Sequence, residues 1–439
     1  MKEAPSKTNT MIATCPACGL LCDDVLIENN QQKIKMLANG CAKAISFFEQ
    51  PLIDASPQIN GKPVTLQQAI AHAAKLLKAS QQPLFSGLST DIQGFRAIYN
   101  LAQKTDGSLQ HTNAKSTARN MKVLQSSGWQ TTTLTEVKNR ADVIVCIGTD
   151  IVSHNPRFFE RFVDCDGLFI SAKQREVIFI GKDFVGNNFV DEHINIKAKL
   201  SPTATPVSLL PCRAVDLPEI TMVLRALVTG KQLKATEVAG VKISDLQAVA
   251  NKLKTAKYAV LAWVAKDLDF AHAELTIQNI TETVAILNNK TRAAGLPLGG
   301  SDGDTTANNA NTWLSGFILN NGALNDEAVE HDLVVWVSSF NRGKLPPESD
   351  KPLIVIGNAN LVGAACSREA SLLNDEGKSR LQAAPTKKPN VFIPIATPGL
   401  DCSGTLFRVD SSVILPLKKI RENALPTLSE VVRGIEALL

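Results

Sequence analysis

Short apolar runs alternate with amphipathic stretches along most of the chain. Six of these runs are dense in large apolar residues, which predicts buried strands. The predicted strands lie at 82–89, 140–150, 175–181, 257–265, 332–339 and 352–360. Apolar residues recur at helical spacing at 64–80, 218–230 and 244–256, and Thr65 is a candidate cap for the first of these helices. Buried strands joined by helices indicate an α/β fold with mainly parallel sheets covered on both faces.

Chain length sets the number of lobes. With 439 residues, the chain is too long for one compact core. We expect two Rossmann-like lobes and, ahead of them, a small lobe at residues 1–60 that carries most of the closely spaced cysteines.

Charge and hydropathy exclude two classes of partner. The net charge of +4 is small for this length, and no basic stripe of the kind that binds nucleic acid is found. No apolar run reaches the ~18–20 residues that span a bilayer. The first ten residues are polar, and the nine cysteines come without a secretory leader, which argues against a disulfide framework. We therefore expect a cytoplasmic protein that binds neither nucleic acid nor membranes.

Four cysteines near the start of the chain are the strongest chemical signal. Cys15, Cys18, Cys22 and Cys41 follow the spacing Cys-x2-Cys-x3-Cys-x18-Cys. Zinc ribbons usually pair two Cys-x2-Cys knuckles, whereas three closely spaced thiolates with a distant fourth suit a 4Fe-4S cubane. Gly19 allows the chain to turn tightly between them. An iron–sulfur cluster is the favoured interpretation, with zinc and no metal as the alternatives.

Other polar motifs are expected to have structural roles rather than to bind ligands. His154 is expected to order its own loop rather than to bind a ligand, and the glycine-rich stretch 296–306 is expected to be a loop without the spacing of a phosphate-binding fingerprint. Residues 138–142 are expected to form the solvated entrance to a strand. The six histidines form no paired metal-ligand motif such as His-x-His.

Several blocks resemble one known family. CPACGLLCDDV with Cys41, the segment 134–162 with its core at 136–142, NTWLSGF at 311–317 and the stretch 403–420 resemble the B-type subunit of formylmethanofuran dehydrogenase, a molybdopterin oxidoreductase. The resemblance implies the molybdopterin-oxidoreductase architecture without its usual C-terminal barrel. Its lobes are then the cysteine lobe at 1–60, a discontinuous α/β lobe at 61–135 and 310–439, and a Rossmann-like lobe at 136–309.

The chain departs from this family where the resemblance places the redox site. A metal-ligating cysteine followed by histidine is replaced by Ser116-Thr117, and an Arg-Gly-His element by Gly299-Gly300-Ser301. An Asp-Pro-Arg that grips the pterin is replaced by Gly181-Lys182-Asp183. A hydroxyl is a poor substitute for a soft thiolate on tungsten or molybdenum. Neither the metal nor molybdopterin is therefore expected, and the vacated cavity is expected to be filled by loops or by the bulky segment 158–170.

One branch of the resembled family has lost this redox chemistry. In the formyltransferase/hydrolase complex of methylotrophs, a formyl group passes from tetrahydromethanopterin to a methanofuran-like cofactor and is released as formate. Resemblance to this branch implies a non-catalytic, structural B-type subunit that works with amidohydrolase-like, formyltransferase and C-type subunits. The alternatives are an active dehydrogenase subunit with a noncysteine metal ligand and a bare iron–sulfur electron carrier.

Overall fold

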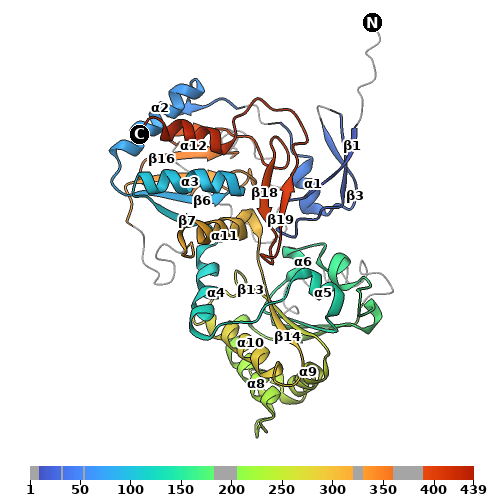
Figure 1. Cartoon of the computed structure of the whole chain (residues 1–439). Coiled ribbons are helices and arrows are strands. Elements are labelled where there is room, and N and C mark those ends of the chain that lie inside the picture. The colour runs from blue at the N-terminus through green and yellow to red at the C-terminus, as the bar shows by residue number, and fades with distance from the viewer. Residues whose placement is uncertain (1–8, 31–32, 53–54, 182–204, 320–329, 359–388) are drawn as a thin grey trace. The chain divides into compact units, whose positions relative to one another are not determined.

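The computed structural model describes residues 9–30, 33–52, 55–181, 205–319, 330–358 and 389–439 (Figure 1). The chain forms two compact units, which are described separately. Unit 1 consists of residues 1–114, 300–408 and 414–439, and unit 2 of residues 115–299 and 409–413. The sequence predicts three lobes with boundaries near 60, 135 and 309. The division into two units does not test those boundaries, which stay a prediction.

Unit 1 is built on a seven-stranded sheet with the order β5-β4-β17-β16-β15-β6-β7. The five strands from β17 to β7 are parallel. The strands are β4 (Gln58–Ile59), β5 (Lys62–Pro63), β6 (Pro83–Ser89), β7 (Ser108–His111), β15 (Leu333–Ser338), β16 (Leu353–Gly357) and β17 (Val391–Ile393). The strand order reverses between β6 and β15, because β7 follows on one side and β16 and β17 on the other. Such a reversal is where ligands bind in α/β sheets, outside the carboxyl ends of the strands.

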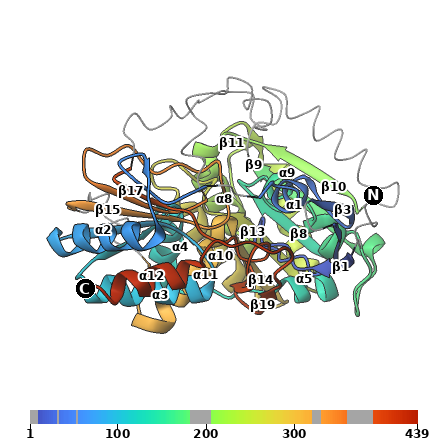
Figure 2. The same ribbon diagram turned by 90° about the horizontal axis from the view of Figure 1, so that it is seen from above.

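Four helices of unit 1 pack into one large apolar cluster. They are α2 (Leu66–Ala79), α3 (Ile92–Lys104), α11 (Asp304–Ser315) and α12 (Leu428–Glu436). Figure 2 shows α2, α3 and α12 lying together along one side of the sheet. Thr65 caps α2 through a capping box with Gln68, as the sequence predicts. The opposite face of the sheet buries a smaller cluster around Trp336 and Phe392.

The rest of unit 1 consists of short elements. The cysteine lobe contains an antiparallel sheet of β1 (Asn9–Ala13), β2 (Val25–Asn29) and β3 (Ile34–Ala38), followed by α1 (Ala42–Phe48). Near the C-terminus, β18 (Gly404–Phe407) and β19 (Ile414–Leu417) pair as an antiparallel hairpin.

Unit 2 has a five-stranded parallel sheet with the order β10-β9-β8-β13-β14. Its strands are β8 (Val143–Ile147), β9 (Glu176–Gly181), β10 (Val207–Pro211), β13 (Ala259–Val264) and β14 (Ala293–Leu298). Its helices are α4 (Ala114–Ser127), at the border with unit 1, α5 (Leu134–Arg140), α6 (Ile151–His154), α8 (Leu217–Thr229), α9 (Ile243–Thr255) and α10 (Glu274–Leu287). Helices α8, α9 and α10 share one apolar cluster with the sheet.

The α/β class with mainly parallel sheets is confirmed, and a strand lies within each of the six predicted runs. Two local predictions are wrong. Residues 138–140 end helix α5, and the strand begins at Val143. The stretch 296–306 is not a loop, because it completes β14, makes a 3-10 turn at Ser301–Gly303 and starts α11. The helix that starts at Leu134 is favoured by its N-cap Thr133, whose side chain accepts a hydrogen bond from the Glu136 backbone N–H.

The bulky segment 158–170 lies in unit 2. Phe158, Phe159 and Phe162 are buried, and the Phe159 ring stacks on Phe179 of β9. These three aromatic rings therefore belong to the core of unit 2, whereas Leu168 and Phe169 are exposed. In the part of the chain that is described, no helix has the length and apolar character needed to cross a membrane.

Candidate functional site

The first three cysteines lie in a tight loop between β1 and β2. The Cys15 backbone N–H donates to the Cys22 carbonyl at 2.8 Å, which closes the loop. Gly19 and Leu21 adopt positive φ angles of 78° and 50°, so the chain reverses sharply between the thiols. The side chains of Cys15, Cys18 and Cys22 are buried.

The pKa of the Cys15 thiol indicates that the four cysteines lie near one another. Burial raises the pKa of its thiol well above the usual value, and the charges of Cys18, Cys22 and Cys41 raise it further, against a backbone hydrogen bond at Ala17 that lowers it. Cys41 precedes α1 as its N-cap residue and is half-buried. A thiolate here needs a compensating positive charge, such as a bound metal would supply.

Zinc and a 4Fe-4S cubane need different arrangements of their thiolates. Among the residues that are described, no group of three or more His, Cys, Asp or Glu side chains is placed to hold one metal ion. In a structural zinc site, four ligands bind the same metal atom. In a 4Fe-4S cubane each thiolate binds a different iron, so the thiols lie farther apart. Three of the thiols are buried, Cys41 is half-buried, and the charges of Cys18, Cys22 and Cys41 act on Cys15. The iron–sulfur cluster and its ligand set stay a prediction.

The cysteine loop touches the segment that precedes α11. A Cβ atom added to Gly19 would lie 2.7 Å from both the Cα and the carbonyl oxygen of Gly300. Two residues past Ser301, a Cβ on Gly303 would lie 2.9 Å from the carbonyl oxygen of Thr90, just beyond β6. The 300–303 turn is therefore held between the cysteine loop and the carboxyl end of β6.

A buried histidine braces this turn. The His111 Nδ1 accepts from the Asn113 backbone N–H at 3.0 Å, and its Nε2 faces the Asp302 carbonyl at 3.4 Å. These partners fix a neutral imidazole with the proton on Nε2. Asn113 donates to Asp304 at 2.8 Å, and Lys344 pairs with the Asp302 carboxylate. Burial lowers the pKa of His111, and Lys344 adds to this effect, while Asp304 and Asp302 oppose it.

Unpaired polar atoms lie at the strand-order reversal of unit 1. The Ser339 backbone N–H donates to the Ser89 carbonyl at 2.7 Å, and the Asn358 amide donates to the Ser339 carbonyl at 2.8 Å. The two serine hydroxyls and the Asn358 Oδ1 are buried and have no hydrogen-bond partner in the described structure. Buried polar atoms normally pair with protein, water or a ligand. This edge can therefore receive a water or a polar ligand.

Two arginines add positive charge to the same edge. Arg421 and Asp401 form a fully buried ion pair at 2.7 Å. Asp401 also accepts from the Thr397 backbone, and Thr397 contacts Asn358. Burial and the nearby Arg421 charge lower the pKa of Arg342 to about 10, although Asp401 raises it. Arg421 pairs with Asp401, and Arg342 lies close enough to feel both charges. Sequence reasoning missed this set. The only sign of this set in the sequence is that β15 is followed by a serine and β16 by an asparagine.

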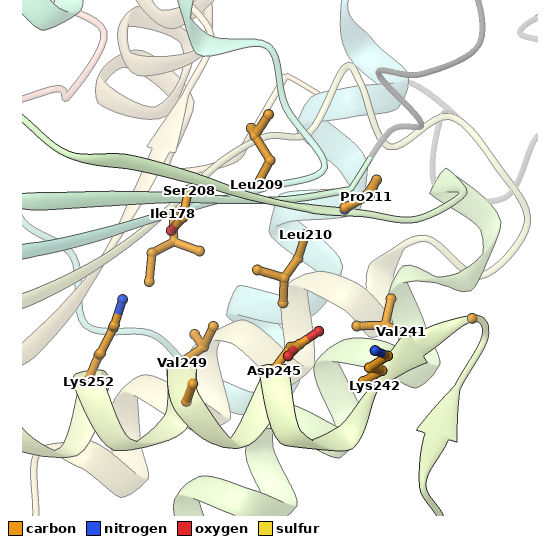
Figure 3. Close-up of a pocket in the computed structure, with 12 residues that line it drawn as sticks. Ile178, Ser208, Leu209, Leu210, Pro211, Val241, Lys242, Asp245, Val249 and Lys252 are labelled. Carbon is orange, nitrogen blue, oxygen red and sulfur yellow. The ribbon is translucent and has the colours of Figure 1, made fainter.

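Unit 2 contains a separate pocket of about 410 Å³ between β9, β10 and α9 (Figure 3). Leu210, Val241 and Val249 are among its apolar lining residues, and Lys242 and Asp245 also line it. No His or Cys occurs among the residues that line this pocket. It therefore offers neither a soft metal ligand nor a histidine base, and it is not the candidate site.

The chain is similar to several known proteins. No family model matches the chain. The chain is 26% identical over 439 residues to the B-type subunit of the tungsten-containing formylmethanofuran dehydrogenase 2 of Methanococcus maripaludis, with 92% of each chain covered. The protein of the same name from Methanocaldococcus jannaschii is 24% identical over 430 residues, again with 92% of each chain covered. The predicted resemblance to the B-type subunit of formylmethanofuran dehydrogenase is confirmed.

A second relative is the B-type subunit of the formyltransferase/hydrolase complex Fhc of Methylorubrum extorquens. It is 34% identical over 90 residues, which cover 20% of this chain and 25% of the relative. The fold is similar to a chain of the crystal structure of the Methylorubrum extorquens FhcABCD complex with methylofuran, with a TM-score of 0.64, 22% identity, and 87% and 98% of the two chains covered. Acetylene hydratase from Pelobacter acetylenicus matches with a TM-score of 0.60 and 8% identity, covering 97% of this chain and 69% of that one. The molybdopterin-oxidoreductase architecture is thus confirmed.

The dehydrogenase positions can now be located. Ser116 and Thr117, where the sequence resemblance predicts the family's metal ligand and imidazole, lie half-buried in the first turn of α4. Gly300 contacts the cysteine loop, and Gly181 ends β9. Lys182 and Asp183 lie outside the described residues.

His154 behaves as the sequence predicts. Its Nε2 lies 2.7 Å from an Asp267 carboxylate oxygen, and the other oxygen accepts from Thr149 at 2.9 Å. Although burial raises the pKa of Asp267, hydrogen bonds and charge from His154 and hydrogen bonds from the 149–150 turn lower it overall. This network orders the loop after β8 by joining it to the loop after β13.

The contact between Gly19 and Gly300 gives a stability prediction. Gly19→Ala must push the cysteine loop away from Gly300, whereas Gly316→Ala has the same φ of 78° and open space around its Cβ. We expect Gly316→Ala to lower the free energy of unfolding by about 1–2 kcal/mol, and Gly19→Ala by a further ~1–3 kcal/mol through overpacking. Chemical denaturation of both variants measures this difference. Equal losses would contradict the close contact.

The buried His111 gives a pH prediction. Because its folded pKa is lowered, the unfolded state binds the proton more readily, so stability is lost as the pH falls through the unfolded value of ~6.5. We expect His111→Gln to lose less stability than the wild type between about pH 7.5 and 5.5. Unfolding by denaturant at both pH values tests this, with His272→Gln, at an exposed histidine, as the control. An identical pH slope in wild type and His111→Gln would contradict it.

Proposed function

We propose that the chain is the B-type subunit of a formyltransferase/hydrolase complex in tetrahydromethanopterin-linked one-carbon metabolism, where formaldehyde is converted to formate. In this role it is a structural subunit derived from formylmethanofuran dehydrogenase. The observation that carries the proposal is Ser116, a hydroxyl on α4 where the dehydrogenase pattern requires a soft metal ligand. The fold shared with a chain of the FhcABCD complex over 98% of that chain supports it.

The chemistry of formyl hydrolysis belongs, in this proposal, to partner subunits. Hydrolysis of a formamide needs an activated water, usually on a metal held by His and carboxylate ligands. The described part of the chain contains no such ligand group. The amidohydrolase-like, formyltransferase and C-type subunits would supply the hydrolase and transferase sites, and the complex would handle the methanofuran-like cofactor.

The cysteine loop has a structural role in this proposal. Cys15, Cys18, Cys22 and Cys41 would hold a 4Fe-4S cluster, which supplies electron transfer only when a redox partner is within reach. Without tungsten, molybdenum or molybdopterin, the cluster would instead tie the cysteine loop to α1, which Cys41 precedes. The loop in turn supports the turn at Gly300.

A second candidate function is an active formylmethanofuran dehydrogenase subunit with a noncysteine metal ligand. The match to tungsten-containing subunits over 92% of the chain favours it. The unpaired atoms of Ser89, Ser339 and Asn358 also favour a bound polar group at the sheet edge. These residues supply no thiolate, so a metal would need a ligand that the family pattern does not provide.

Activity of the purified complex distinguishes the two functions. We expect formate release from the formylated furan cofactor without reduction of an artificial dye. We also expect Ser116→Ala to leave formate release within about twofold of the wild type, because the hydroxyl takes no part in the reaction. Loss of a metal-ligating histidine in the amidohydrolase-like subunit should abolish release and serves as the positive control. Dye reduction that depends on the formyl substrate, or a large loss in Ser116→Ala, would contradict the proposal.

A further inference from the structure

Unit 1 displays large apolar side chains at the C-terminal end of α11. Trp313 is 63% exposed and Phe317 is 76% exposed, and Leu314 lies between them. Ile414 of β19 is exposed as well. We call these four residues the aromatic patch. Trp and other aromatic residues are enriched where protein surfaces bind each other.

Contacts within unit 1 connect the two parts of the patch. The Trp313 ring packs edge-on against Phe407 of β18, with ring centroids 4.7 Å apart. Phe407 is paired across the hairpin with Ile414. Helix α11 and the β18–β19 hairpin lie beside each other (Figure 1). Trp313 and Ile414 therefore lie on the same side of unit 1, next to Phe407, and Phe317 follows Trp313 by four residues.

The backbone under Phe317 is held in place. Gly316 ends α11 in the left-handed conformation with φ of 78°. The Phe317 N–H donates to the Ser315 hydroxyl at 3.0 Å, and its carbonyl accepts from the buried Asn311 amide at 2.9 Å. An exposed aromatic ring on a fixed backbone has less entropy to lose on binding than one on a mobile loop. The patch is thus pre-organised for a partner.

Positive charges flank the patch. Arg96 is exposed on α3 one turn before Tyr99, whose hydroxyl contacts the Leu314 carbonyl at 3.5 Å. Lys418 is exposed directly after β19. Neither has an ion-pair partner within the ranges that the structure describes. Exposed cations beside an apolar patch favour a partner surface that carries negative charge at its rim.

We propose that the aromatic patch is the docking surface for a different protein chain, through an apolar pocket rimmed by carboxylates. This inference rests on the proposed function, because a structural subunit acts through its partners. Trp313 and Phe317 fill the pocket, and Arg96 and Lys418 face its acidic rim.

Binding of the full-length chain to the purified amidohydrolase-like, formyltransferase and C-type subunits tests the patch. We expect the double variant Trp313→Ser with Phe317→Ser to bind one of these subunits about thirtyfold more weakly, the effect of losing an aromatic hot spot. Its unfolding midpoint should fall only slightly, because both side chains are mostly exposed and the contact of Trp313 with Phe407 is lost. Met222→Ser with Leu275→Ser, at exposed apolar residues of α8 and α10, is the matched control and should bind normally.

A second variant tests the charges. Arg96→Glu with Lys418→Glu should slow association with the same subunit about tenfold and remove part of its salt dependence. Unchanged affinity in the aromatic variant, an equal loss in the control, or self-association of the wild type that the aromatic variant abolishes would overturn the patch. None of these results depends on the redox state of the complex. Formyl-dependent dye reduction would overturn the proposed function and leave the binding result as it stands.

Discussion

The close approach of the Gly19 and Gly300 backbones is the constraint on which unit 1 depends. It joins the cysteine loop to the turn that starts α11, and Gly303 joins the same turn to the end of β6. His111 and Lys344 then brace Asp302 within the turn. The cysteine lobe, the sheet edge and α11 are thereby fixed to one another without any bulky side chain at the contact. A residue with a Cβ at position 19 cannot keep this arrangement.

The carboxyl edge of the unit 1 sheet retains the form of a binding site while the thiolate of the resembled redox site is missing. Ser89 ends β6, and Ser339 and Asn358 directly follow β15 and β16. Their buried polar atoms need water or a ligand. Arg342 and Arg421 leave excess positive charge beside Asp401. These groups can hold a polar molecule but cannot replace a thiolate on a soft metal. The fold is thus compatible with a scaffold whose chemistry has passed to partner subunits.

The sequence predicts the parts of the fold that depend on local patterns. Apolar runs such as 140–150 and the cap at Thr65 identify their elements because burial and capping are local signals. The helix at 134–140 was missed because its polar residues show no apolar stripe, and its start depends on the Thr133 cap. The cysteine spacing predicts which thiols gather, and the pKa of Cys15 is consistent with that grouping. The Ser89, Ser339 and Asn358 set could not be found, because only the strand order brings the three together.

The central claim is that the chain keeps the molybdopterin-oxidoreductase fold without its redox metal. Elemental analysis of the purified complex, with tungsten, molybdenum and iron measured per copy of this chain, tests it most directly. The account predicts no stoichiometric tungsten or molybdenum, together with about four iron atoms for the cubane at Cys15, Cys18, Cys22 and Cys41. One tungsten or molybdenum atom per chain would contradict it.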